Sequence, residues 1–273
     1  MRVVAPGRAD VDPSDVAVPQ GTTMTRIQLA LAALSLGALA VVSACGASDG
    51  ASPTIGASPT GTDAAEIGAT ASDEVDLTVT DEDGATSVDA ARLEATLDAA
   101  QPASTLDAAA VDGLEYMREE EKLARDVYQT LGAQWDLGVF DNIAASEQTH
   151  TDAIVTLLDR YGIGDPARPE VGAFASPVLQ DLHDRLVAKG SASLVDALTV
   201  GATIEDLDII DIEARKTGVA DIDLVYDNLM KGSRNHLRSF VDELEAQGAT
   251  YVPQYLGQEA YDAIVTSPVE RGG

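Results

Sequence analysis

The sequence predicts an all-α fold in which four long helices form a bundle, arranged as two up-and-down pairs joined by one long crossover. The first observation is periodicity, because from Thr105 onward Ala, Leu, Ile and charged residues recur three and four positions apart. The second is glycine: Gly162, Gly218 and Gly248 follow periodic segments, as glycine commonly does where helices end. The third is the lengths of the connections, of which the middle one is long and the other two are short.

The helices can be placed in order along the chain. The four long ones are expected near residues 106–133, 141–161, 193–216 and 221–247. Short connections make the first two helices antiparallel neighbours, and likewise the last two. The long crossover contains a shorter helix near Pro177–Lys189, and Tyr251–Ile264 is expected to form a capping strap with a terminal helix. The sequence therefore predicts one helical domain over residues 105–273.

The charge of the chain limits its partners. The net charge is −29, which argues against nucleic acid because phosphates require a basic surface. This acidity fits attraction of cations, and it fits equally well the solubility of a protein outside the cytoplasm. The single cysteine, Cys45, excludes an internal disulfide and a metal centre built from several thiolates.

The segment 24–45 is expected to direct export. Arg26 precedes the apolar run Ile27–Val42, which is shorter than the ~20 residues of a membrane-spanning helix. The run ends in the letters VSAC, with Cys45 last, and this resembles the lipobox of bacterial lipoproteins. The resemblance implies that residues 24–44 are a lipoprotein signal peptide and that a lipid on Cys45 anchors the protein to the extracytoplasmic face of the cell membrane. The alternative is an ordinary secretory signal in which the cysteine is incidental.

Two further segments lie outside the predicted domain. Residues 1–23 do not fit such a signal and are interpreted as an over-extended gene start before Met24. Residues 45–104 are rich in small and acidic residues, and we expect a disordered acidic linker, since such a segment buries too little apolar surface to offset its ordering entropy. Within it, Val75–Thr80 alternates like a short strand and Val88–Ala100 fits one amphipathic helix.

Each long helix carries ionisable residues in the middle of its inward-facing stripe. An unpaired buried charge costs several kcal/mol or is neutralised, so such positions need a common reason. A pair of metal ions supplies one, because carboxylate and imidazole bind divalent cations directly. Pairs such as Glu147 and His150, three residues apart, share one helical face. The predicted metal ligands are Glu121, Glu147, His150, Glu205, Asp208 and His236.

Simpler interpretations apply to the individual residues. Glu121 belongs to a run of three glutamates that usually marks a solvated face, and a shift of one residue would select Glu120. His183, in the crossover, is treated as a surface residue. Tyr128 is the catalytic candidate, and its alternative is a core tyrosine with a bonded hydroxyl.

Two motifs carry a resemblance to a known superfamily. EKLARDVY, from Glu121 to Tyr128, is similar to the first helix of rubrerythrins and ferritins, and EQTH, from Glu147 to His150, looks like their second-helix ligand pair. Residues 119–255, with EEEKLARDVY, SEQTH, TIEDLDIID and GSRNHLRSF, resemble a bacterial family within the ferritin-like superfamily, domain of unknown function 2202. The resemblance implies a ferritin-like four-helix bundle with a di-metal site of iron or manganese.

One position departs from the ferritin-like pattern. Ser233 stands where the last helix of the superfamily carries a glutamate three residues before its histidine. Asp208 is expected to compensate for the missing carboxylate. Gly232, beside His236, is expected to leave room for a bound oxygen species.

Three hypotheses for function follow. The first is a di-metal oxidoreductase, ferroxidase-like or peroxide-reducing, that binds dioxygen or peroxide at open positions facing Gly232 and Gly201 and receives electrons from outside. The second is a non-catalytic module that captures or senses metal at the cell surface. The third is a metal-free structural bundle whose polar middle is held by hydrogen bonds and salt bridges.

Overall fold

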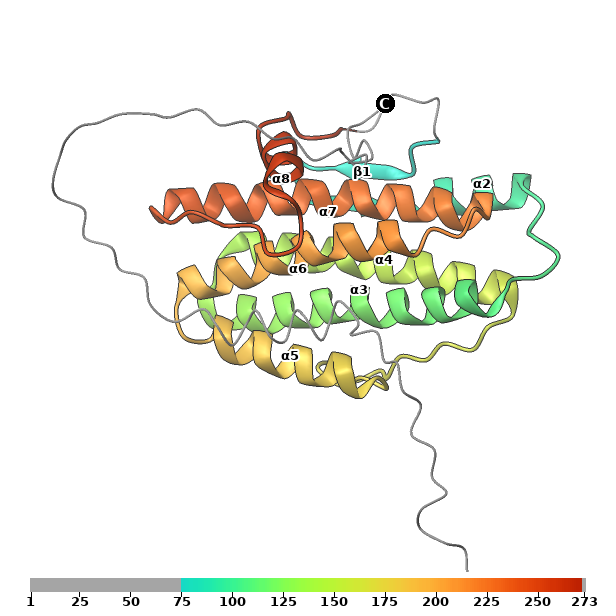
Figure 1. The fold of residues 1–273 in the computed structure, drawn as a ribbon, viewed down its shortest axis with the longest axis horizontal. Helices are drawn as coiled ribbons and strands as arrows, with labels where there is room; N and C mark the ends of the chain where they lie inside the picture. The colour runs from blue at the N-terminus through green and yellow to red at the C-terminus, as the bar shows by residue number, and fades with distance from the viewer. Residues whose placement is uncertain (1–74, 272–273) are drawn as a thin grey trace, which may run out of the picture. The chain divides into compact units, whose positions relative to one another are not determined.

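The computed structural model describes residues 75–271 (Figure 1). The predicted start at Met24, the signal peptide at 24–44, the lipidated Cys45 and the linker as far as residue 74 lie outside the described residues.

Four long helices dominate the described part of the chain. They are α3 (Ala108–Trp135), α4 (Gly138–Tyr161), α6 (Leu194–Ala214) and α7 (Ala220–Ala246). Helix α3 packs along α4 and against α6, while α7 packs along α6 and against α4 (Figure 1). The predicted all-α class is confirmed, with one two-stranded hairpin as an addition.

Capping residues determine where the helices begin and end. The carboxylate of Asp107 accepts the N–H of Ala110 at the start of α3, and the hydroxyl of Ser193 accepts the N–H of Asp196 at the start of α6. Gly162 ends α4 with a φ of 67°, a left-handed conformation that glycine adopts without steric cost. Helix α6 ends at Ala214, before the predicted stop at Gly218, which instead lies in the loop to α7.

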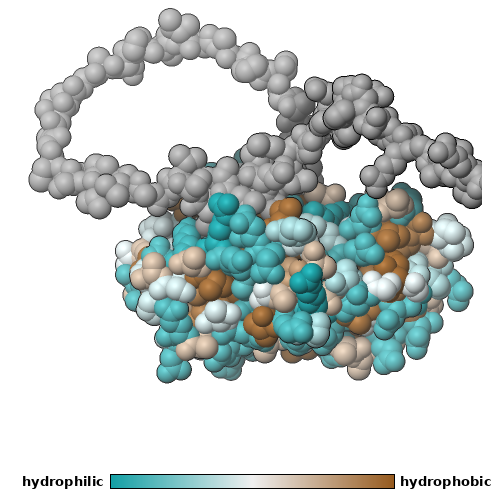
Figure 2. Space-filling model, turned by 90° about the horizontal axis from the view of Figure 1, so that it is seen from below, coloured by the Kyte–Doolittle hydropathy of each residue, from teal (hydrophilic) through white to brown (hydrophobic). Residues whose placement is uncertain are grey.

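Two shorter helices flank the four long ones. Helix α5 (Pro177–Gly190) lies in the long crossover and packs on α3 and α6, and α8 (Gln258–Val265) packs on α7. Hydrophilic residues predominate on the face shown in Figure 2, where apolar residues form separate spots. Within the described range, none of the helices combines the length and the apolar character needed to span a bilayer.

The linker prediction was wrong from residue 75 onward. Strands β1 (Thr78–Thr80) and β2 (Thr86–Val88) form an antiparallel hairpin, and α2 (Ala90–Ala99) follows it. The hairpin is held because Leu77 is buried and its N–H donates to the Asn228 side chain at 2.8 Å. Helix α2 is amphipathic, as expected, and buries two leucines. A few buried leucines and polar contacts to α7 thus order a segment whose composition is mostly small and acidic.

Candidate metal centre

The four long helices bring ionisable residues to one buried place. Helix α3 contributes Glu121, α4 contributes Glu147 and His150, α6 contributes Glu205, and α7 contributes His236. Each of these side chains is buried, with 2% or less of the residue surface exposed. The inward stripes predicted from helical periodicity therefore converge on one another.

Glu147 lies at the centre of this cluster. Its Oε2 is 3.0 Å from Nδ1 of His150, and its Oε1 is 2.8 Å from Nδ1 of His236. The two imidazole rings stack with their centroids 5.4 Å apart. Glu121 Oε2 lies 3.5 Å from Nδ1 of His150, and Glu205 Oε2 lies 3.7 Å from Nδ1 of His236. The cluster thus has two similar halves, each with one histidine and one glutamate, and Glu147 belongs to both.

Several buried atoms of the cluster lack a hydrogen bond of acceptable geometry. Among the described residues they include Nδ1 of His150, Nδ1 of His236 and Oε1 of Glu121. A buried polar atom without a partner costs about 1–3 kcal/mol. Ligand atoms of Glu147, His150 and His236 lie within 4.8 Å of one another, close enough to share a cation. A bound metal ion would satisfy the imidazole nitrogens and the carboxylates together, so these residues fit a metal.

The cluster shifts the pKa values of its members in opposite directions. Burial raises the pKa of Glu121 to about 8, although His150 opposes this. Burial would also raise the pKa of Glu147, but the charges of His150 and His236 lower it below the ordinary range. Burial disfavours charge on His236, yet Glu147 raises its pKa to about 9, and it also raises that of His150. The metal-free cluster therefore holds protons at neutral pH that a cation would displace.

Tyr128 lies beside the cluster on α3. Its hydroxyl donates to Oε1 of Glu205 at 2.6 Å, and its ring is fully buried against Phe240. Burial and the neighbouring Glu205 raise the pKa of Tyr128 well above its ordinary value, so the hydroxyl keeps its proton. The tyrosine thereby orients one oxygen of a candidate ligand.

Asp208 lies outside the group of ligand atoms that share one point. The hydroxyl of Ser233 donates to its Oδ2 at 2.5 Å and reaches the carbonyl of Leu229 at 3.1 Å. Burial, together with Glu121, raises the pKa of Asp208 well above its ordinary value. Ser233 thus stands at the α7 position where a glutamate was expected, and its hydroxyl is hydrogen-bonded to Asp208 of α6.

The structure corrects the expected open positions at two glycines. A Cβ on Gly232 would come within 2.5 Å of Cε1 of His150, and a Cβ on Gly201 would come within 2.5 Å of the Phe240 ring. Both glycines allow close packing of a neighbouring side chain, so the expectation of open space for dioxygen or peroxide beside them was wrong.

Two other assignments concern burial. His183, expected at the surface, is buried with 8% exposed, and its ring packs against Phe174. The run of three glutamates is buried as well, with 5%, 4% and 1% exposed from Glu119 to Glu121. Glu119 accepts the N–H groups of Ala175 and Ser176, which ties the crossover to α3. Among the three, Glu121 is the one that faces His150.

Sequence reasoning missed the contribution of the hairpin. The backbone N–H of Thr86 lies 3.0 Å from Nε2 of His236, and its carbonyl oxygen lies 2.8 Å from Nε2 of His150. The one sequence signal for the hairpin was the strand-like alternation of residues 75–80. That alternation predicts a strand, but it does not predict which residues the strand contacts.

These features define the class of protein: a helical domain with a buried cluster of carboxylates and imidazoles that can hold a metal ion. More particularly, the family model described as "Uncharacterized protein domain (DUF2202)" matches residues 110–268, which is more than half of the chain. The chain belongs to this family, and the family predicted from the sequence is confirmed.

One relative has also been solved. The uncharacterized protein MJ0754 of Methanocaldococcus jannaschii is 56% identical over 164 residues, which cover 59% of this chain and 89% of that protein. The crystal structure of hypothetical protein MJ0754 from Methanococcus jannaschii DSM 2661 matches with a TM-score of 0.61 and 52% identity, over 63% of this chain and 99% of that chain. All six predicted ligands lie within the family match, whereas Thr86 precedes it.

Proposed function

We propose that this protein binds metal in a ferritin-like four-helix bundle, at a centre that holds two iron or manganese ions. The supporting observation is the pair of buried imidazole Nδ1 atoms that lack hydrogen bonds and face the two oxygens of Glu147. His150 and Glu121 form one half of the centre, His236 and Glu205 form the other, and Glu147 is shared. Imidazole with carboxylate is a ligand set suited to iron and manganese.

Asp208 completes the proposed ligand set. Ser233 holds its carboxylate next to the cluster, and the pKa of Asp208 is raised by Glu121 and Glu205 as well as by burial. A cation at the centre would favour the ionised form of Asp208, which then balances the charge that the missing glutamate on α7 would have supplied.

The proposed activity is that of an oxidoreductase, ferroxidase-like or peroxide-reducing. Iron or manganese supplies redox chemistry with dioxygen or peroxide when bound. The protein's own residues exclude water, hold Glu147 between two imidazoles, and keep the proton of Tyr128 on its hydroxyl beside Glu205. Because the chain has one cysteine, its electrons would come from a separate donor.

A second candidate function is metal binding without turnover. It is favoured by the packing at Gly201 and Gly232, where side chains fill the space in which an oxygen species was expected. A protein of this kind captures or senses metal at the cell surface. A metal-free structural bundle is the third outcome of the test below.

A metal titration separates these functions. The full chain is stripped with chelator and titrated with Mn²⁺, or with Fe²⁺ under anaerobic conditions, in a calorimeter. We expect tight binding, which Glu147→Gln weakens at least about 100-fold. Asp159→Asn removes the same charge from an exposed position of the same helix and serves as the matched control, with unchanged binding expected. The absence of binding by the unmodified chain would establish the structural bundle, and consumption of peroxide by the loaded protein would distinguish enzyme from capture module.

We also propose that the protein is lipid-anchored through Cys45 on the outer face of the cell membrane. The support is the signal-like segment 24–45, whose final cysteine is the only one in the chain. In a bacterial host the full chain should incorporate labelled fatty acid and sediment with membranes, and Cys45→Ala should do neither. Incorporation by the variant would contradict the assignment.

A further inference from the structure

The backbone of Thr86 contacts both histidines of the centre. Its N–H donates to Nε2 of His236 at 3.0 Å, and its carbonyl oxygen lies 2.8 Å from Nε2 of His150. Thr86 is completely buried. One residue of a hairpin therefore touches, on their outer sides, the two rings whose Nδ1 atoms face Glu147.

The pairing of the hairpin explains why these backbone groups are free to do so. In an antiparallel ladder, pairs that exchange hydrogen bonds alternate with pairs whose N–H and C=O groups point outward. Thr86 lies opposite Thr80 in a pair of the outward type, as does Val88 opposite Thr78. The N–H of Val88 accordingly donates to Oγ1 of Thr149 on α4, and that of Thr86 donates to His236 on α7.

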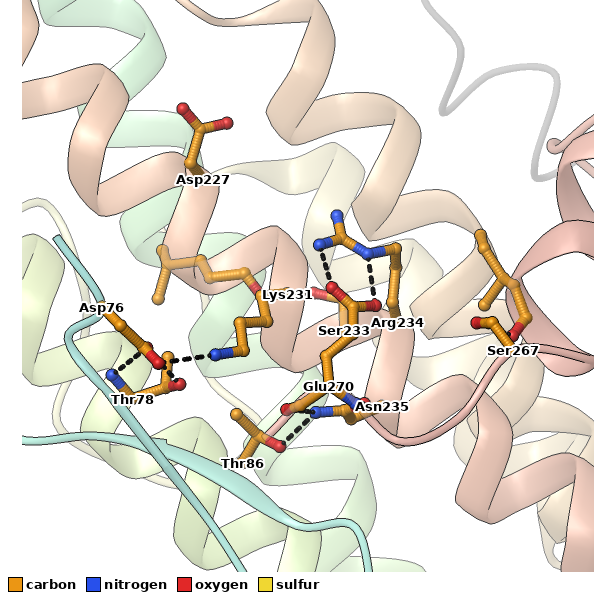
Figure 3. A network of polar contacts seen from close by, with 12 residues as sticks. Asp76, Thr78, Thr86, Asp227, Lys231, Ser233, Arg234, Asn235, Ser267 and Glu270 are labelled. Atoms are coloured by element: carbon orange, nitrogen blue, oxygen red, sulfur yellow. Dashed lines mark hydrogen bonds and ion pairs between the residues drawn. The ribbon is translucent and has the colours of Figure 1, made fainter. Parts of the chain in front are cut away.

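Side chains around Thr86 hold it in place. Nδ2 of Asn235, the residue before His236, donates to Oγ1 of Thr86 at 2.8 Å and to the carbonyl oxygen of Glu270 at 2.9 Å (Figure 3). Lys231 on the same helix donates to Asp76 at 2.9 Å and fastens the start of the hairpin to α7. Thr86 is thus fixed to the helix that carries one of the two histidines.

The two contacts impose opposite proton positions on the neutral rings. A carbonyl oxygen only accepts, so Nε2 of His150 carries a hydrogen and its Nδ1 has a lone pair facing Glu121 and Glu147. A backbone N–H only donates, so Nε2 of His236 has the lone pair and its Nδ1, 2.8 Å from Oε1 of Glu147, carries the hydrogen. A histidine that ligates a metal through one nitrogen donates the N–H of the other to an acceptor. His150 meets this requirement, and His236 does not.

We propose that Thr86 is a positioning residue that makes the two halves of the metal centre unequal. The half of His150, Glu121 and Glu147 binds the first cation tightly, and the half of His236 and Glu205 binds the second cation weakly. Binding at His236 requires removal of the Nδ1 hydrogen while the Thr86 N–H still faces Nε2. This inference rests on the proposed metal-binding function, and it assigns a role to a residue that precedes the segment matched by the family.

The proton positions can be measured without metal. The full chain, labelled with ¹⁵N-histidine and stripped of metal, is studied by NMR at increasing pH until the ¹⁵N shifts of each ring show that it is neutral. We expect a hydrogen on Nε2 for His150 and a hydrogen on Nδ1 for His236. The same tautomer on both rings would overturn the proposal, whether or not the protein binds metal.

Two substitutions at the same residue test the effect on binding. Thr86→Pro removes the N–H that faces His236, and it removes no backbone bond between the two strands because that N–H points outward. Thr86→Val removes the same hydroxyl and keeps the N–H, so it is the matched control. In Mn²⁺ titrations we expect the second cation to bind about 10-fold more tightly to Thr86→Pro than to Thr86→Val, with the first unchanged.

Other outcomes of these titrations would contradict either the role of Thr86 or the proposed function, and they can be told apart. Equal weakening of both binding steps in Thr86→Pro would mean that Thr86 only supports the fold, and it would overturn the proposal. Equal affinities of the two steps in the unmodified chain would overturn it as well. If the unmodified chain binds no metal, the proposed function fails, and the NMR measurement alone then decides whether Thr86 sets the two proton positions.

Discussion

Glu121 and Lys122 are neighbours in α3 but belong to two different buried clusters. On one side of the helix, Lys122 and Asp126 form a buried ion pair in which each group has further partners. Lys122 donates to the carbonyl oxygens of Glu170 and Ala173, and Asp126 accepts from Arg125 and from the N–H of Gly172. This cluster is complete without any ligand, and it fastens the crossover to α3.

On the other side, Glu121 enters a cluster that the protein leaves incomplete. An oxygen of Glu121 and the Nδ1 atoms of His150 and His236 have no hydrogen-bond partner. Both clusters carry the desolvation cost of burying charge, but only in the first are the charged groups fully bonded inside the protein, whereas the second leaves these atoms without a hydrogen bond. The difference teaches that burial of charge alone does not indicate function; buried charge with unsatisfied atoms facing one point does.

The largest effect is expected where the complete cluster is broken. Lys122→Met should lower the free energy of unfolding by about 3–5 kcal/mol, because Asp126 stays buried without its main counterion. Urea denaturation measures the change. Arg185→Met, which breaks the exposed pair with Asp181, is the control and should cost about 0–1 kcal/mol. Similar losses for both variants would remove the distinction on which the comparison depends.

An intermediate effect is expected in the incomplete cluster, as a dependence of metal affinity on pH. Burial raises the pKa of Glu121 to about 8, so its ionised, ligating form becomes populated only as the pH rises toward that value. The proton of Glu121 should by itself make Mn²⁺ affinity increase about tenfold for each pH unit below 8. Because the folded-state pKa is raised, the metal-free protein should lose stability as the pH rises from the ordinary value of 4.5 through 8.

Glu121→Gln provides the control for this pH dependence. Glutamine does not titrate, so the variant should bind Mn²⁺ more weakly, with a smaller slope against pH, and its metal-free form should not lose that part of the stability. Calorimetric titrations and thermal unfolding between pH values on both sides of 8 give both quantities. An unchanged slope in the variant would show that the displaced proton belongs to another group.

The smallest effect is expected for the ion pair of Asp76 and Lys231, which is neither fully buried nor fully exposed. Burial opposes the charge of Asp76, but Lys231 and the N–H of Thr78 lower the pKa of Asp76 to about 2. Its contribution should be present above the ordinary value of 3.8 and should disappear as the pH falls through about 2. Asp76→Asn should cost about 0–1 kcal/mol at neutral pH, measured by urea denaturation. A difference that persists at the lowest pH would mean that Asp76 acts through its shape and not its charge.

Helical periodicity allowed most of the fold and the centre of the site to be predicted. Glu147 and His150 share a face because they are three residues apart in one helix, and such local geometry can be read directly from sequence. The same periodicity placed Glu205 and His236 on the inward stripes of their own helices, and the structure brings His236 to Glu147 and Glu205 to His236.

The errors arose where distant segments meet. The contacts of Thr86 with His150 and His236 span 64 and 150 residues, and they are made by backbone atoms that every residue possesses. A glycine in a sequence shows that a side chain is absent but not what fills its place, and at Gly232 the ring of His150 does. Averaging composition over a long linker also hid buried residues such as Leu77.

The hairpin stands at the start of the described part of the chain. A force applied at residue 75 reaches the domain just before β1, where Asn228 and Lys231 of α7 hold Leu77 and Asp76. The next strand carries the backbone groups that touch both imidazoles. Mechanical attachment and ligand geometry therefore share one short stretch of polypeptide, so a pull on the start of the hairpin acts next to the groups that touch the two rings.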